Sequence, residues 1–192
     1  GSPNGLALQT LDIYIDRDPG KGTGARLLLP GRNAAVAEGF GWDIALWAEG
    51  WTPGIYAPDQ QGKPKPVPGA SLRIAVNPNQ RTVLLRAPRR IFGAGFDPRQ
   101  AAYLAAVLSQ EGFPSPGVWR VRDVLPQAAQ WRLGGGPADT NHTRILDLAW
   151  PAGRSPTQEA LLSAYRPSQE PNLDRLGPDD FAQLPMLQPE GR

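Results

Sequence analysis

Aromatic rings and polar side chains gather in the second quarter of the chain. Asp43 and Trp47 are four residues apart, which on one face of an extended strand separates them by about 13 Å, with the small Ala45 between them. Trp51 and Tyr56 follow in the next loop. Carbohydrate sites combine these residue types, because a flat ring packs on sugar C–H groups while carboxylates and amides take the hydroxyls. The pattern makes these four polar and aromatic residues candidate carbohydrate ligands. The alternative is that the rings cover the core.

The remaining tryptophans fall into two groups. Trp131 follows no strand pattern and precedes three consecutive glycines, so its ring either faces solvent as a further carbohydrate contact or plugs the core. Trp42, Trp119 and Trp150 are assigned to the structural framework. Trp119 in particular alternates with a valine, as a core residue of a strand does.

Three carboxylates near the N-terminus have the chemistry of a calcium site, because Ca²⁺ takes oxygen ligands. They are Asp12, Asp16 and Asp18. The spacing from Asp16 resembles the start of an EF-hand loop, but Leu27 stands where the bidentate glutamate belongs, which excludes an EF-hand. A loop site built from Asp16, Asp18 and backbone oxygens stays open. The alternative is a solvated turn with local Asp hydrogen bonds.

Catalytic and haem chemistry have little support. A Ser-His-Asp triad would need His142, the only histidine, and the chain has no nucleophile-elbow motif. Acids for a glycosidase pair exist, but no pattern brings two of them across a cleft. A haem module would have His142 and Met186 as its axial pair. We expect no enzyme activity and no haem.

Composition limits the fold and the partner. Gly and Pro number 22 each among 192 residues, which disfavours a helical bundle, while 40% hydrophobic residues and six Trp disfavour disorder. The net charge of +2 comes from 20 basic and 18 acidic residues without a Lys/Arg run, so nucleic acid is not indicated. Cysteine is absent and no apolar run approaches the length of a membrane span. Because the first residue is Gly and no leader precedes it, we expect a processed chain or a fragment.

Alternating hydrophobic residues predict an all-β fold, an antiparallel β-sandwich with long Gly/Pro-rich loops and one or two short helices. In 11–15, the apolar residues face the core and Asp12, Tyr14 and Asp16 face away. The other expected strands are 25–29, 42–49, 72–76, 82–87, 118–124 and 144–149, with a strand also following a helical turn that begins at Asp97. The stretch 50–70 is expected to be irregular and extended.

A helix should begin at the Ser155-Pro156-Thr157 capping signal and run to about Tyr165. We therefore expect a β-sandwich module over 1–165 and an extended C-terminal tail over 166–192, packed on the surface.

Four longer runs resemble one family, the C-terminal module of glucodextranase and of some secreted pullulanase-type enzymes. The runs are residues 8–16 (LQTLDIYID), 29–34 (LPGRNA), 109–123 (SQEGFPSPGVWRVRD) and 131–144 (WRLGGGPADTNHTR). The resemblance covers about residues 2–187. It implies a non-catalytic β-sandwich, similar to family-nine carbohydrate-binding modules and to the DOMON group, beside the catalytic domain of an extracellular α-glucan hydrolase. Such modules have been likened to domains that hold an enzyme at the cell surface. Because the family's module usually begins earlier than Gly1, an N-terminal strand is expected from a neighbouring segment or chain.

The resemblance and the residues together predict a carbohydrate-binding or cell-surface-anchoring module, exported to the cell surface or medium. Its partners would be an α-glucan or a cell-envelope glycan, and a neighbouring domain or chain at the sheet edge. Weak contacts to polysaccharide would concentrate the attached enzyme there. Two alternatives stay open: a structural or assembly subunit that binds no sugar and buries its rings, and a haem-binding module of the DOMON type.

Overall fold

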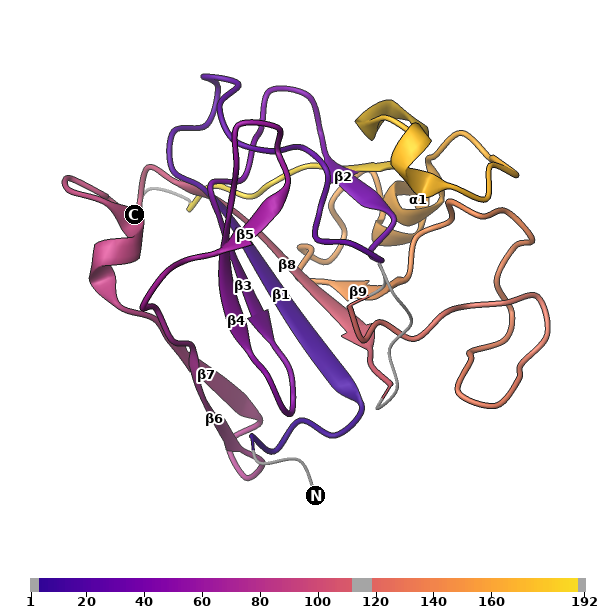
Figure 1. Cartoon of the computed structure of the whole chain (residues 1–192), viewed down its shortest axis with the longest axis horizontal. Coiled ribbons are helices and arrows are strands. Elements are labelled where there is room, and N and C mark those ends of the chain that lie inside the picture. Colours follow the sequence, from indigo (N-terminus) through magenta and orange to yellow (C-terminus); the bar gives the residue numbers. More distant parts are fainter. Residues whose placement is uncertain (1–3, 112–118, 190–192) are drawn as a thin grey trace.

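The computed structural model describes residues 4–111 and 119–189. Its framework is a six-stranded sheet in the order β5-β4-β3-β1-β8-β9, in which neighbouring strands are antiparallel. A parallel pair, β2 and β10, and a separate hairpin, β6–β7, complete the strands (Figure 1). The strands are β1 (Gln9–Asp16), β2 (Ala34–Val36), β3 (Ile44–Ala48), β4 (Gly54–Pro58), β5 (Pro64–Pro66), β6 (Arg73–Asn77), β7 (Thr82–Arg86), β8 (Ala102–Ser109), β9 (Ile145–Leu148) and β10 (Ala182–Leu184). The helical segments are α1 (Gln158–Ser163) and the single 3₁₀ turns η1 (Arg89–Phe92), η2 (Leu173–Arg175) and η3 (Pro178–Asp180).

Each face of the central sheet carries a hydrophobic cluster. The larger cluster includes Tyr14, Trp47 and Leu104 from the sheet and is closed by side chains from β2, β10 and α1. The smaller includes Ile15 and Leu46 and is closed by the β6–β7 hairpin and η1. Side chains alternate between the two clusters along β1, β3 and β8, as the two-residue period of a strand requires. The all-β, sandwich-like fold predicted from the sequence is confirmed.

Strand β1 differs from the prediction, because its polar face is the more deeply buried one. Asp12 and Tyr14 are 0% exposed, whereas Leu11 and Ile13 on the other face are only half-buried. The reason is a partner that no local pattern reveals: Arg32 lies fully buried against Asp12 and forms an ion pair with it. A carboxylate that is paired and hydrogen-bonded can occupy a core position.

Two predicted strands are absent, and four observed strands, β2, β4, β5 and β10, were not predicted. Val121 and Val124 form only isolated bridges, and the same holds for the segment 25–29; residue 118 lies outside the described part of the chain. The proline-rich stretch expected to be irregular instead forms β4 and β5. Pro64 and Pro66 lie on the edge strand β5, where a missing N–H costs little, and Pro58 is the last residue of β4. The predicted hairpin around residues 77–80 is confirmed as β6–β7.

Helix α1 is confirmed with a shifted start. Thr157 is its N-cap, and its hydroxyl accepts a hydrogen bond from the Ala160 amide at 3.2 Å, so the cap lies two residues after Ser155. The turn after Asp97 leads directly into β8. Within the described residues, each helix is too short or too polar to cross a membrane.

The C-terminal segment was expected on the surface, but its last strand enters the core. Ala182, Leu184 and Met186 are at most 4% exposed and belong to the larger cluster. β10 runs parallel to β2, so the chain end supplies a backbone ladder as well as apolar side chains. Without these side chains the cluster would be open on that side. The segment after residue 165 is therefore part of the module's core and not, as predicted, a tail packed on the surface. Whether a further N-terminal strand completes the sheet stays a prediction.

Candidate functional site, a groove beside an aromatic cluster

A groove of about 470 Å³ lies among four segments that are distant in the sequence. Loop 27–34 forms one wall, the loop before β5 (61–65) a second, the segment 173–181 a third, and Trp119 stands at its rim. Its polar side chains are Asn33, Gln61, Lys63, Lys65 and Asp174. Leucines, prolines, an alanine, two glycines, Phe181 and Trp119 supply the rest of the lining. Apolar walls with a few polar groups are the usual composition of a small-ligand site.

Trp119 belongs to a cluster of three aromatic rings. Its ring centroid lies 4.9 Å from that of Tyr56 and 5.7 Å from that of Trp47, and the latter two are 6.2 Å apart. Trp47 is 6% exposed and donates its indole N–H to the Thr10 hydroxyl at 3.0 Å, so its ring belongs to the core. Trp119 is half-buried, which leaves part of its ring facing the groove. The rings beneath it fix its orientation.

Burial raises the pKa of the Tyr56 phenol, while Arg32 opposes that effect and Glu49 adds to it. Its hydroxyl therefore keeps its proton at neutral pH and can act as a hydrogen-bond donor beside the Trp119 ring.

The backbone at the rim is held in an unusual conformation. Trp119 and Arg120 have φ angles of 48° and 61°, in the left-handed region that residues other than glycine rarely adopt. Such positions cost about 1–3 kcal/mol each and tend to cluster at functional sites. The Arg120 guanidinium lies 5.7 Å from the centroid of the exposed Trp51 ring and its Nε lies 3.8 Å from the Glu49 carboxylate. Trp51 is not among the residues that line the groove, so Arg120 contacts an exposed ring outside it.

The wall formed by loop 27–34 rests on a buried ion pair. Arg32 Nε donates to Asp12 Oδ2 at 2.6 Å and Nη2 to Oδ1 at 3.1 Å, a bidentate arrangement with both side chains fully buried. Tyr14 donates to the same carboxylate at 2.9 Å. Burial alone would lower the pKa of Arg32, but Asp12 and Tyr14 raise it above its ordinary value, so the guanidinium stays charged. Burial and then Asp12 raise the pKa of Tyr14 well above its ordinary value.

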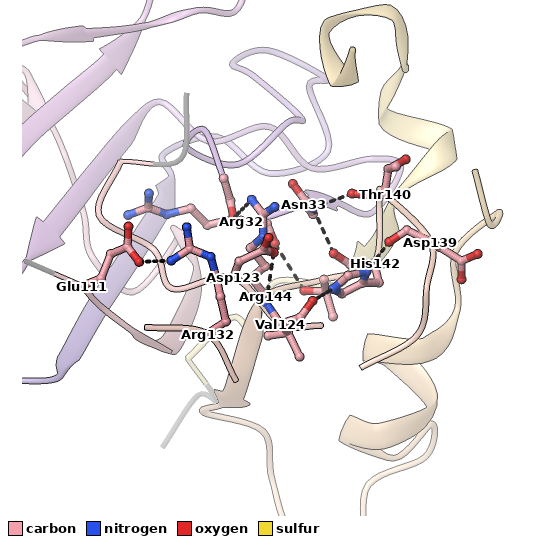
Figure 2. Close-up of polar contacts among 12 residues, drawn as sticks. Arg32, Asn33, Glu111, Asp123, Val124, Arg132, Asp139, Thr140, His142 and Arg144 are labelled. Atoms are coloured by element: carbon pink, nitrogen blue, oxygen red, sulfur yellow. Dashed lines mark hydrogen bonds and ion pairs between the residues drawn. The ribbon is translucent and has the colours of Figure 1, made fainter. Parts of the chain in front are cut away.

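A second network ties the same wall to the loop 139–144 (Figure 2). The Asn33 side-chain amide donates to the carbonyl oxygens of Thr140 and His142 at 3.3 and 3.0 Å. The two His142 ring nitrogens face the carbonyl oxygens of Asp139 and Val124 (Figure 2). These contacts hold Asn33 in place at the groove and leave neither imidazole nitrogen directed to a ligand. The haem alternative needs such a nitrogen, so this geometry gives it no support.

The residues predicted to bind carbohydrate are only partly brought together. Trp47 and Tyr56 join the aromatic cluster with Trp119, whereas Trp51 lies outside it, against the Arg120 guanidinium. Asp43 is engaged by Arg17, whose guanidinium lies 3.3 Å from one oxygen and whose amide donates to the other at 2.9 Å.

Trp131 is 50% exposed and is not among the residues that line the groove. Trp119 was assigned to the framework, although it lines the groove. The signal that could have identified it is its position directly after the Gly/Pro-rich run at 112–117, where a loop is more probable by composition than a strand.

The acidic residues at the end of β1 converge on a third carboxylate. Oxygens of Asp16, Asp18 and Asp43 lie within 4.8 Å of one another, and Asp16 is 1% exposed. Burial raises the pKa of Asp16, the amides of Gly41 and Asp18 oppose this, and the charges of Asp43 and Asp18 add to it. A hydrogen bond from Thr23 lowers the pKa of Asp18. The donor set is the oxygen-only type that calcium takes, and a cation would offset the mutual repulsion.

A comparison with known families connects this geometry to a described module. Residues 1–173 match the C-terminal binding module, SLH-like, of glucodextranase. No curated protein matches the chain significantly. The matched family is a binding module and not a catalytic domain, which supports a non-catalytic binding role. Because the match covers most of the chain and confirms the resemblance seen in its long motifs, the protein belongs to the family of glucodextranase C-terminal binding modules.

Proposed function

We propose that this module binds neutral α-glucan chains in the groove, with Trp119 as the ring on which a sugar unit packs. The observation that carries the proposal is the position of Trp119: a half-buried ring lining a groove that also presents amide and ammonium groups. Gln61, Lys63 and Lys65 are placed to receive sugar hydroxyls. The family, a binding module of a glucan-hydrolysing enzyme, supports the same ligand class.

We infer further that the module works by targeting. Individual sugar contacts are weak, but a hydrolase tethered to a module that holds the polymer gains local substrate concentration without any new catalytic group. The protein would accordingly be exported, to the medium or to the cell surface. Anchoring to an envelope glycan uses the same groove chemistry and differs only in the polymer bound.

The test is retardation of the purified module in gels that contain dextran or pullulan. Trp119→Ala is expected to weaken glucan affinity by about tenfold or more, as loss of a central aromatic anchor does. Trp131→Ala is the matched control and should migrate like the wild type. Because alanine at φ 48° can loosen the rim, the exposed pair Gln61→Ala and Lys65→Ala provides a second probe of the groove.

An unretarded wild-type protein would contradict the proposal. So would equal retardation of the wild type, Trp119→Ala and the Gln61/Lys65 variant.

We also propose that Asp16, Asp18 and Asp43 bind calcium, and the convergence of the third carboxylate supports this. Arg17 and Lys21 already pair with two of these side chains, so the affinity should be weak, with Kd of about 10⁻⁴–10⁻³ M, as in other extracellular modules. Millimolar calcium is expected to raise the Tm of the wild type but not of Asp18→Asn, which keeps an oxygen for the Thr23 hydrogen bond. Glu159→Gln, an exposed carboxylate on α1, is the control.

The calcium effect should weaken as the pH falls, because protonation removes the negative charge that attracts the cation. Asp16, whose pKa is raised by burial, should take up its proton before Asp18, whose pKa is lowered by the Thr23 hydrogen bond. A Tm that does not respond to calcium at neutral pH, or an equal response in Asp18→Asn, would rule the site out.

A further inference from the structure

The β6–β7 hairpin and the turn after it concentrate positive charge. Five arginines lie between residues 73 and 90, and no acidic residue occurs from 60 to 96. This segment alone carries more positive charge than the whole chain's net +2, so the remaining residues are net negative. All five arginines are exposed: Arg73, Arg81, Arg86, Arg89 and Arg90. The sequence shows no run of basic residues, and the hairpin is what gathers them.

The register of the hairpin places two of these charges directly opposite each other. Arg73 pairs with Arg86 in the antiparallel ladder, on the same face as Ala75 and Leu84. The other face directs Ile74 and Leu85 against the smaller hydrophobic cluster. The arginine face therefore points away from the sheet, and Leu84 on it is 48% exposed. We call the side chains of Arg73, Ala75, Leu84 and Arg86 the outer face of the hairpin.

The outer face has an electrostatic cost that the ion pairs of the described residues do not offset. Like charges directly opposite on a strand pair are destabilising. Within residues 4–111 and 119–189, no carboxylate forms an ion pair with Arg73, Arg86 or Arg89. Arg89 follows shortly after β7, at the same end of the hairpin as the Arg pair. An anion bound there would convert repulsion into attraction.

We propose that the outer face of the hairpin binds an acidic glycan whose successive sugar units carry carboxylates. Opposed side chains on neighbouring strands have Cβ atoms about 5 Å apart, which suits negative groups repeated along a polymer, and arginine binds carboxylate through two parallel hydrogen bonds. The outer face carries no aromatic ring on which a nucleobase could stack. Leu84 is its one large apolar side chain, too little for insertion into a membrane surface. The choice of a glycan as the partner rests on the proposed function. The clustering of arginines on the outer face is observed independently of that function.

The experiment compares retention of the whole chain on immobilised polygalacturonate with retention on neutral dextran. Arg73→Gln combined with Arg86→Gln is expected to weaken polygalacturonate binding by about fivefold, the loss of two exposed ion pairs, and to leave dextran binding unchanged. Wild-type binding to polygalacturonate should vanish in about 1 M salt, where the Debye length is about 3 Å. Because a repulsive pair is removed, the Tm of this variant should equal or exceed that of the wild type.

The matched control is Arg166→Gln combined with Arg175→Gln, which removes the same charge from side chains that are 76% and 71% exposed and paired with Asp180 and Glu170. It should bind polygalacturonate like the wild type. Equal loss in both double variants would show an effect of net charge alone and overturn the site. Stronger wild-type binding to single-stranded DNA or to anionic vesicles than to polygalacturonate would overturn the partner class. A failure of Trp119→Ala to change dextran binding concerns only the groove.

Discussion

Replacing Arg32 by methionine is expected to lower the free energy of unfolding by about 3–5 kcal/mol. The substitution keeps much of the side-chain volume but leaves the Asp12 carboxylate fully buried, without its bidentate partner. Tyr14 would then be the one remaining hydrogen-bond donor to Asp12 among those described. The loss also releases the Pro30 carbonyl, which accepts from Arg32 at 2.9 Å. Urea unfolding followed by tryptophan fluorescence measures the effect.

A double-mutant cycle separates the ion pair from simple packing. Asp12→Leu combined with Arg32→Met should be more stable than Arg32→Met alone, because a buried pair replaced by apolar groups leaves no uncompensated charge. Arg166→Met, which breaks a surface pair with Asp180, should cost at most about 1 kcal/mol. If Arg32→Met were as mild as Arg166→Met, the loop 27–34 would not depend on the buried pair.

Leu184→Ala is expected to lower the free energy of unfolding by about 2–5 kcal/mol, the range for a fully buried leucine. Leu184 is 0% exposed and is the last residue of β10, which pairs with β2 and closes the larger hydrophobic cluster. This strand lies beyond residue 173, where the family match ends. The expected loss therefore tests whether the chain needs its C-terminal segment to complete the core.

The matched control for this strand is Leu146→Ala on the edge strand β9, where the side chain is 48% exposed. It should change the free energy of unfolding by about 0.5 kcal/mol or less. If the two alanine variants lost comparable free energy of unfolding, β10 would contribute little to the stability of the core.

The strands that were predicted correctly are those with a local signal, either alternating apolar residues within the strand or a turn next to it. The β6–β7 hairpin has a turn of Asn and Pro between two apolar runs, and its register is fixed locally. β10 gave no such signal, because three residues of a Pro-rich tail reveal nothing of the parallel partner about 150 residues earlier. The buried face of β1 was assigned to solvent for the same reason: Asp12 looks like a surface residue until Arg32, 20 positions away, is placed beside it.

The candidate site, too, was predicted only where the local sequence carries a signal. The sequence pointed to the polar-aromatic region around Trp47, Trp51 and Tyr56, and the structure joins two of these rings, Trp47 and Tyr56, to one cluster with Trp119. It did not reveal Trp119, because that ring reaches the groove through two successive left-handed residues and not through a strand alternation. Nor could it show that Trp47 is buried, since a strand between two covered faces buries both of its sides.

Ligand binding at the groove is tested most directly by following the indole N–H resonances of the isotope-labelled module during titration with an isomalto-oligosaccharide. The account predicts that the Trp119 indole signal shifts and saturates, while that of Trp131, exposed but outside the groove, stays in place. No movement of the Trp119 signal at saturating oligosaccharide, or a shift confined to Trp131, would contradict it.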